Sequence, residues 1–188
     1  MAIQLQKKET VSLTKVDSGL QRIVAGLGWD PATVNGHPVD LDLSVFMMGA
    51  GGKLVSDEFF VFYNNPSSPD GAAFYPVDSS AGEGDGDDEV IRVDLLRADP
   101  RVEFLYFAVT IDRSEERAHH FGHVQNACIR ILNADTNQVL CEYRLNEHFS
   151  GEDSLLIATM ARNEGAWDLE AVGQAFMGGL GTLAEMYQ

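Results

Sequence analysis

The feature that most constrains the fold of this chain is the alternation of short apolar segments with turn-forming residues. The segments are rich in β-branched and aromatic residues, and Gly, Asn, Asp or Pro separate them. This pattern is typical of two packed antiparallel sheets. We therefore predict an all-β sandwich of about ten strands, formed as a single domain by residues 1–188. The predicted strands are Thr10–Leu13, Ile23–Gly28, Leu41–Met48, Phe59–Tyr63, Glu89–Leu95, Val102–Ile111, Ala127–Leu132, Val139–Leu145, Ser154–Arg162 and Leu169–Phe176.

Two short helices and two tight turns are expected beside the strands. Asp112 and the glutamate three residues later are spaced as a capping box, which predicts a helix over Ser114–His120. Apolar residues at helical spacing predict a second helix over Leu180–Tyr187. Gly-rich residues 49–52 and the Asn/Asp-rich residues 133–137 predict hairpin turns. The run Phe59-Phe60-x-Phe62-Tyr63 is expected in the core, under a helix or loop.

Residues 82–89 form an acidic, glycine-spaced segment with the sequence Gly-Glu-Gly-Asp-Gly-Asp-Asp-Glu. These carboxylates repel one another, so the segment is destabilising unless a cation binds it. Ligands that are all oxygen atoms select hard cations, and calcium accepts six to eight of them in irregular geometry. Most acidic runs are merely solvated turns, and that alternative applies to an isolated run of this kind. The segment follows a long stretch without apolar periodicity, from Asn64 to Asp88, which is typical of a binding loop.

The charge of the chain excludes several classes of partner. It has 13 Lys+Arg and 29 Asp+Glu, a formal net charge of −16, so nucleic acid and anionic lipid should repel it. The N-terminus has no apolar stretch of signal-peptide length, and no window is long enough to span a membrane. We expect a soluble, cytoplasmic protein in which Cys128 and Cys141 are buried, reduced thiols.

Other oxygen-rich segments are predicted to converge on the acidic segment. In the predicted strand at Leu41–Met48, alternation puts Asp42 and Ser44 on the face opposite the core, together with Asp40 just before it. The pair Asn64-Asn65 follows another predicted strand, and amide carbonyls can bind a hard ion. Two further acids are available, Asp30 at a strand end and Asp78 inside the long loop.

Several familiar motifs do not fit. Twelve-residue counts from Asp85 and Asp40 end at Leu96 and Gly51, so neither supplies the bidentate glutamate of an EF-hand. The histidines at 119, 120 and 123 have zinc-like spacing without a fourth ligand, which favours a surface helix end. Arg130 and Arg144, on neighbouring predicted strands, are expected to pair with carboxylates.

Several ordered motifs resemble those of one protein family. They are Gly26-Leu27-Gly28-Trp29-Asp30, Asp40-Leu41-Asp42, Phe62-Tyr63-Asn64-Asn65, Gly82 through Glu89, Phe121-Gly122-x-Val124, Ile129-Arg130 and Ala171-Val172-Gly173-Gln174 through Gly178-Gly179-Leu180. Together they resemble the tellurite-resistance TerD family of calcium-binding bacterial stress proteins, over nearly the whole chain. The chain departs from the family pattern at two places. One is Tyr75-Pro76-Val77, and the other is His123, a position at which the family commonly has glutamine.

The resemblance implies a calcium-binding β-sandwich that acts in stress resistance with related proteins and a membrane-protein partner. It also implies one or two Ca²⁺ ions, since calcium sites take several oxygen ligands each. Carried over by position, the calcium motifs fall on Asp30, Asp40, Asp42, Asn64, Asn65, Asp78, Glu83, Asp85, Asp87, Asp88 and Glu89.

These observations favour a non-catalytic module whose loops calcium orders for binding a partner. A first alternative is a module in which bound calcium bridges to a phospholipid, a phosphate or a sugar. That mode needs a basic or aromatic rim beside the ion. A second alternative is a metal-dependent phosphohydrolase, because paired carboxylates and a divalent ion can activate water. The sequence places no His or Lys near the motifs for that chemistry.

Overall fold

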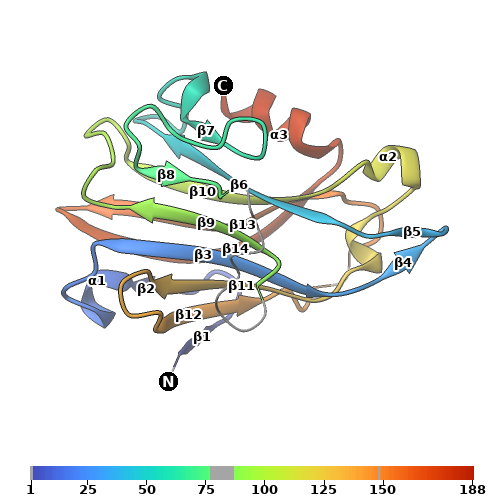
Figure 1. Cartoon of the computed structure of the whole chain (residues 1–188), viewed down its shortest axis with the longest axis horizontal. Coiled ribbons are helices and arrows are strands. Elements are labelled where there is room, and N and C mark those ends of the chain that lie inside the picture. The colour runs from blue at the N-terminus through green and yellow to red at the C-terminus, as the bar shows by residue number, and fades with distance from the viewer. Residues whose placement is uncertain (1, 77–86, 148) are drawn as a thin grey trace.

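The computed structural model describes residues 2–76, 87–147 and 149–188 and arranges them as two stacked sheets (Figure 1). One sheet has the order β1-β12-β11-β3-β9-β8, and the other has the order β2-β14-β13-β10-β6-β7. The predicted antiparallel sandwich is thus confirmed, with one parallel pair, β1 with β12, at a sheet edge. The first sheet contains β1 (Ile3–Leu5), β3 (Arg22–Asp30), β8 (Ala73–Phe74), β9 (Glu89–Asp94), β11 (Gln125–Asn133) and β12 (Val139–Arg144). The second contains β2 (Thr10–Ser12), β6 (Leu41–Met48), β7 (Phe60–Val61), β10 (Phe104–Ile111), β13 (Ser154–Asn163) and β14 (Ala166–Phe176).

The main core lies between the two sheets. Alternate residues of each strand point inward, as in Ile23 and Leu27 of β3 and in Leu41, Leu43 and Val45 of β6, which are all fully buried. The alternation predicted for β6 is therefore confirmed. It turns the side chains of Asp42 and its neighbours at even positions away from this core.

A second apolar cluster lies on the outer face of the second sheet, beneath α3 (Gly179–Tyr187). The rings of Phe46 and Phe60 stack with centroids 4.1 Å apart, and the Tyr187 ring meets Phe46 edge-on at 5.1 Å. Leu183 of α3 is fully buried here. The predicted C-terminal helix is confirmed, and Phe60, with Phe62 partly buried beside it, packs under this helix as expected, whereas Phe59 lies in the main core and Tyr63 is exposed.

Two local predictions are wrong. Only Phe60–Val61 of the predicted strand Phe59–Tyr63 pairs in the sheet, because the chain then turns back with hydrogen bonds between Phe62 and Asn65. The predicted helix Ser114–His120 is shortened to α2 (Ser114–Arg117) and a 3₁₀ turn at Phe121–His123. Arg113, with φ of 48°, precedes α2 and no side chain caps it, so the predicted capping box is absent.

Elements too short for periodicity to reveal were missed. They are β1, β8, the small hairpin of β4 (Thr33–Val34) and β5 (His37–Pro38), α1 (Leu13–Val16) and a 3₁₀ turn at Asp57–Phe59. The hairpin and α2 project from the same end of the sandwich (Figure 1). Within the described parts of the chain, no helix is long and apolar enough to cross a membrane.

Both cysteines are buried and carry free thiols, as predicted. Burial raises the pKa of Cys128 to about 11 and that of Cys141 to about 12, so both thiols stay protonated at neutral pH. The histidine segment is not a surface helix end, since His119 is 3% exposed and its Nε2 lies 3.2 Å from the carbonyl oxygen of Val34.

Candidate functional site: a cluster of carboxylates at one end of the sandwich

Asp40, Asp42 and Asp112 meet where β6 begins and β10 ends. These strands are antiparallel neighbours, with Leu41 opposite Ile111 and Asp42 opposite Thr110. The backbone amide of Asp112 donates a hydrogen bond to the carbonyl oxygen of Asp40 at 2.9 Å. Asp112 was not predicted as a site residue, although its position directly after a strand that pairs with Leu41–Met48 was a usable signal.

Asp88 and Glu89 reach the same end from the other sheet. The Asp88 amide donates to the carbonyl oxygen of Leu27, and the Asp88 carboxylate accepts from the Trp29 amide at 3.1 Å. Glu89 accepts a hydrogen bond from the Tyr75 hydroxyl and one from the backbone amide of Leu43 on β6. That amide is free to donate because β7 pairs with β6 at Val45 and Phe46 and not at residue 43.

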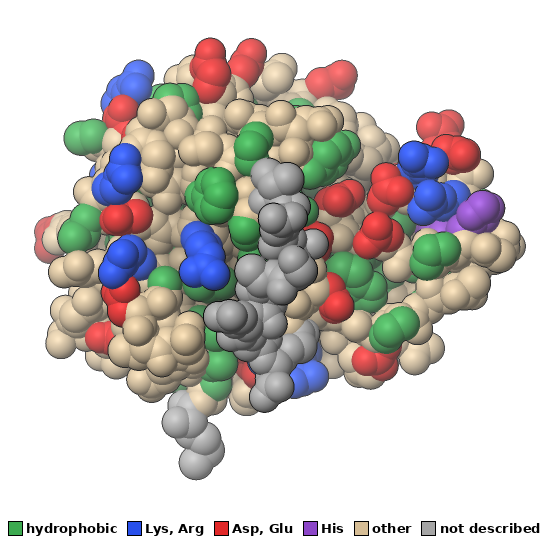
Figure 2. Space-filling view, viewed as in Figure 1, with side chains coloured by type: hydrophobic (Ala, Val, Ile, Leu, Met, Phe, Trp, Pro, Cys, Tyr) green, Lys and Arg blue, Asp and Glu red, His purple; other side chains and the backbone are tan. Residues whose placement is uncertain are grey.

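The pKa values indicate that these carboxylates act on one another. Burial, together with the charges of Asp40 and Asp112, raises the pKa of Asp42 to about 6. Burial also raises the pKa of Glu89 to about 7, with added repulsion from Asp42 and Asp40 and partial relief from the Tyr75 hydrogen bond. The pKa of Asp40 is raised by burial and by Asp112. Without a cation, ionising this group of acids is therefore unfavourable. Figure 2 shows carboxylates gathered over this side of the molecule.

Asp87 is held differently from its neighbours. Its Oδ1 accepts two hydrogen bonds from Arg130, at 2.9 Å from Nε and 2.8 Å from Nη2. The carboxylate lies against the backbone at Gly26, where a Cβ would stand 2.1 Å from Asp87 Oδ2. Burial still raises the pKa of Asp87, despite Arg130. The predicted pairing of Arg130 is confirmed, as is that of Arg144, which lies 3.2 Å from Glu142.

The remaining predicted ligands are scattered or lie outside the described residues. Asp30 accepts a hydrogen bond from Asn126 at 2.6 Å, and Asn64 is exposed in the turn after β7. The side-chain amide of Asn65 donates to the carbonyl oxygens of Phe60 and Glu58, so its nitrogen braces that turn. Asp78, Glu83 and Asp85 fall in residues 77–86 and lie outside the part of the chain that the structure describes.

The described residues do not form a finished metal site. Within them, no three His, Cys, Asp or Glu side chains lie close enough to hold an ion. The donor set nevertheless fits calcium in its chemistry, because Asp40, Asp42, Asp112 and Glu89 supply only oxygen and their charges repel without a cation. An ion would have to draw these carboxylates closer together.

A pocket of about 350 Å³ opens beside Asp42 and Asp112. Tyr63, which is 50% exposed, and Arg113 also line it, so an aromatic and a basic side chain border the acids. The lining contains no His or Lys among the described residues.

The fold and this end of the molecule define an acidic, two-sheet β-sandwich with carboxylates from both sheets converging. The family model described as the TerD domain matches residues 1–187, and the chain belongs to this family. It is 39% identical over 188 residues to general stress protein 16U of Bacillus subtilis (strain 168), covering 100% of this chain and 97% of that protein. It is 37% identical over 187 residues to tellurium resistance protein TerD of Serratia marcescens, covering 100% of this chain and 97% of that protein.

A solved structure supports the fold independently. The crystal structure of a homologue of telluride resistance protein (TerD) from Streptomyces coelicolor A3(2) superposes with a TM-score of 0.67. The match covers 90% of this chain and 99% of that one at 24% sequence identity. At this identity, the likeness extends to the fold alone.

Proposed function

We propose that this TerD-family protein binds calcium and acts in bacterial stress resistance as a non-catalytic module whose loops the ion orders. The observation that carries the proposal is a contact between the two sheets: Glu89, at the start of β9, accepts a hydrogen bond from the backbone amide of Leu43 in β6, next to Asp42. Asp40, Asp42, Asp88, Glu89 and Asp112 are the described residues that would hold the ion. Calcium would supply the positive charge that these carboxylates lack.

Calcium suits this set better than magnesium or a transition metal. The acids come from three separate segments and are not prearranged, and calcium tolerates six to eight oxygens at irregular positions. Magnesium demands a near-ideal octahedron and releases its waters reluctantly. Softer metals select nitrogen and sulfur ligands, whereas both cysteines here are buried and protonated.

Binding would link the calcium level to the stability of this end of the sandwich. A ligand that binds only the folded state stabilises it by RT ln(1 + [L]/Kd), about 2.7 kcal/mol at a hundredfold excess over Kd. The ion would hold β6, β9 and the end of β10 in one arrangement. That arrangement would present a constant surface to related stress proteins or to a membrane-protein partner.

The stress role follows from the relatives. The names of the similar proteins from Bacillus subtilis and Serratia marcescens refer to general stress and tellurium resistance. Neither name refers to a reaction, which supports a binding role for this chain. We therefore prefer a module that acts through partners to a metal-dependent phosphohydrolase.

A second candidate function is recognition of an anion through the bound ion. The pocket beside Asp42 supports it, since Tyr63 and Arg113 provide the aromatic and basic rim that such a ligand needs. The ligand class would be a phosphate, a lipid headgroup or a sugar. Sedimentation with anionic liposomes in calcium, and its absence in EDTA, would favour this mode over simple loop ordering.

Thermal unfolding tests the main proposal. Purified protein is stripped with EDTA, dialysed, and melted alone, with calcium, or with magnesium. We expect calcium to raise Tm more than magnesium, and Asp42→Asn to abolish the calcium effect. The matched control is Glu103→Gln, because Glu103 is exposed and precedes β10 at the end opposite Asp112. Equal shifts in the wild type and Asp42→Asn would contradict the proposal.

A further inference from the structure

A pocket of about 310 Å³ lies at the end of β9 opposite the carboxylate cluster. Three arginines line it, Arg22, Arg92 and Arg97, in a chain that has only 13 Lys+Arg against 29 Asp+Glu. Figure 2 shows several Lys and Arg side chains over the left half of the visible face, with Asp and Glu side chains between them. The protein thus has an arginine-lined hollow separated from its acidic end by the length of one strand.

The strand register brings this pocket together on the outer face of the first sheet. Arg92 of β9 pairs with Phe74 of β8 and with Val24 of β3, so their side chains share one face. Ile91 and Val93 on either side of Arg92 are buried in the core, which fixes Arg92 on the outer face. Two strands and a turn therefore position the guanidinium groups.

The acids in the lining are already engaged. Asp135 pairs with Arg22, and Asp94 accepts hydrogen bonds from the backbone amides of Leu96 at 3.1 Å and Arg97 at 3.2 Å. The Asp94 carboxylate holds the turn at Leu96 and Arg97, and the Asp135 carboxylate neutralises the charge of Arg22. They leave Arg92 and Arg97 as the positive groups available to a ligand.

Arg92 and Arg97 have unused donors. Within the described parts of the chain, Arg92 makes no hydrogen bond or ion pair, and Arg97 donates from its side chain only once, from Nη2 to the carbonyl oxygen of Asp70 at 3.3 Å. Each guanidinium has five N–H donors in a planar fork. Such forks match the oxygens of a phosphate or carboxylate two at a time.

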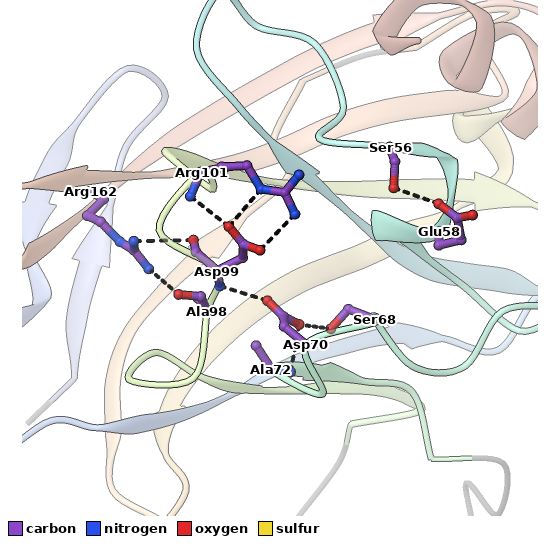
Figure 3. Close-up of polar contacts among 9 residues, drawn as sticks. All are labelled: Ser56, Glu58, Ser68, Asp70, Ala72, Ala98, Asp99, Arg101 and Arg162. Carbon is purple, nitrogen blue, oxygen red and sulfur yellow. Dashed lines mark hydrogen bonds and ion pairs between the residues drawn. The ribbon is translucent and has the colours of Figure 1, made fainter.

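Arg97 is held in place by a network behind the pocket. A Cβ at Gly71 would lie 2.8 Å from Arg97 Nη2, so the glycine makes room for this guanidinium. The next residue back, Asp70, accepts from the amides of Ala72 at 2.9 Å and Asp99 at 2.8 Å, which ties two loops together (Figure 3). Hydrogen bonds through Asp70 therefore hold the loop that carries Gly71 and Ala72, two residues that line the pocket.

Phe74 gives the pocket an apolar wall. Its side chain is 44% exposed, and it stands beside Arg92 across the β8–β9 pair. An aromatic side chain next to free guanidinium groups offers a stacking surface for a flat ring whose charged group is bound by the arginines.

We propose that this pocket binds a small phosphate monoester that carries a planar ring. The arginine forks would hold the phosphate, and Phe74 would stack on the ring. The volume is at the lower end of small-molecule sites, which suits one ring with one phosphate. A long nucleic acid is disfavoured, because the net charge of −16 repels an extended polyanion. The proposal does not depend on calcium binding.

An NMR titration with phenyl phosphate as the probe tests this pocket. The full-length protein is titrated in EDTA, in parallel with inorganic phosphate and with phenol, which lacks the charge. We expect phenyl phosphate to bind most tightly and to shift the amides of β8 and β9. Arg92→Gln and Arg97→Gln should each weaken it about tenfold, the loss expected for a charge-assisted hydrogen bond. Phe74→Ser should reduce its affinity to that of inorganic phosphate.

The matched control is Arg113→Gln, an exposed arginine that borders the acidic pocket instead. It should leave phenyl phosphate binding in EDTA unchanged. The proposal is overturned if phenyl phosphate does not bind at about 10 mM, roughly ten times the Kd of a weak site of about 1 mM. It is also overturned if Arg92→Gln and Arg113→Gln weaken binding equally, or if binding requires calcium. Surface substitutions of this kind change stability little, so all variants should fold.

Discussion

The hydroxyl of Tyr75 donates a hydrogen bond to the carboxylate of Glu89, joining a residue that precedes the acidic segment to the last residue of that segment. The donor favours the ionised carboxylate and so lowers the pKa of Glu89, although burial keeps that pKa near 7. Tyr75→Phe removes the hydrogen bond and keeps the ring. We expect the pKa of Glu89 to rise above about 7, as followed by the carboxyl carbon in an NMR pH titration. A lower or unchanged value would show that the hydroxyl does not stabilise the charge.

The raised pKa values also predict how stability depends on pH in metal-free protein. Asp42 and Glu89 have folded-state pKa values of about 6 and about 7, above the ordinary values of 3.8 and 4.5. The folded state therefore binds more protons than the unfolded state between about pH 4 and 7. Stability from these groups is complete below about pH 4 and is lost as the pH rises to about 7.

Urea unfolding in EDTA measures this dependence. Asp42→Asn should flatten the decline in unfolding free energy between about pH 4.5 and 7 relative to the wild type, while Glu103→Gln should not. The comparison between variants is needed because His123, whose pKa is lowered by burial, acts in the opposite direction. Identical slopes for the wild type and Asp42→Asn would exclude a role for Asp42.

Gly26 is predicted to be required for the position of Asp87. A methyl group at this residue would overlap the Asp87 carboxylate and break its ion pair with Arg130. We expect Gly26→Ala to destabilise the protein by about 1–3 kcal/mol, the usual cost of overpacking. Gly151→Ala is a suitable control, since a Cβ added there would meet nothing within 4 Å and the φ of Gly151 is not positive. Equal stability of the two variants in urea would refute the close contact.

The contribution of α3 packing to the free energy of unfolding can also be measured. Leu183 is fully buried in the outer apolar cluster, so Leu183→Ala should cost about 2–5 kcal/mol of unfolding free energy. Leu96→Ala provides the comparison, because Leu96 is 71% exposed and its truncation should change stability by less than about 0.5 kcal/mol. A small effect at Leu183 would mean that α3 is not packed on the sheet.

The strands were predictable because each carries a strong local signal. Leu41–Met48 alternates around buried leucines and matches β6 at both ends. The predicted strand Phe59–Tyr63 was too long because Phe60 and Phe62 stack under α3 and the chain turns back after Phe62. Composition alone cannot distinguish this packing from sheet pairing. Likewise, α2 is only four residues long despite a good capping pattern, because the residues on either side of it have positive φ angles. These angles are 48° at Arg113 and 53° at Ala118.

The candidate site was predictable only in part. Asp42 and Glu89 stand out by residue type, but their approach across the sandwich depends on how β6 and β9 are placed in the two sheets. Nothing in the sequence marked Tyr75 as part of the site, and Asp112 was marked only by its position directly after a predicted strand. The fold brings both side chains to the carboxylates. The pairing of Asp87 with Arg130 likewise arises from neighbouring strands.

The most direct test of calcium binding is a calorimetric titration of metal-free protein with calcium, and separately with magnesium. At about pH 6.5 it should give saturable calcium binding that is tighter than magnesium binding. Proton release should accompany it, seen as a heat that depends on the buffer, because Glu89 is partly protonated there. Asp42→Asn should weaken this binding severely while Glu103→Gln leaves it intact. Absence of calcium binding, or equal affinity in the wild type and Asp42→Asn, would contradict the account.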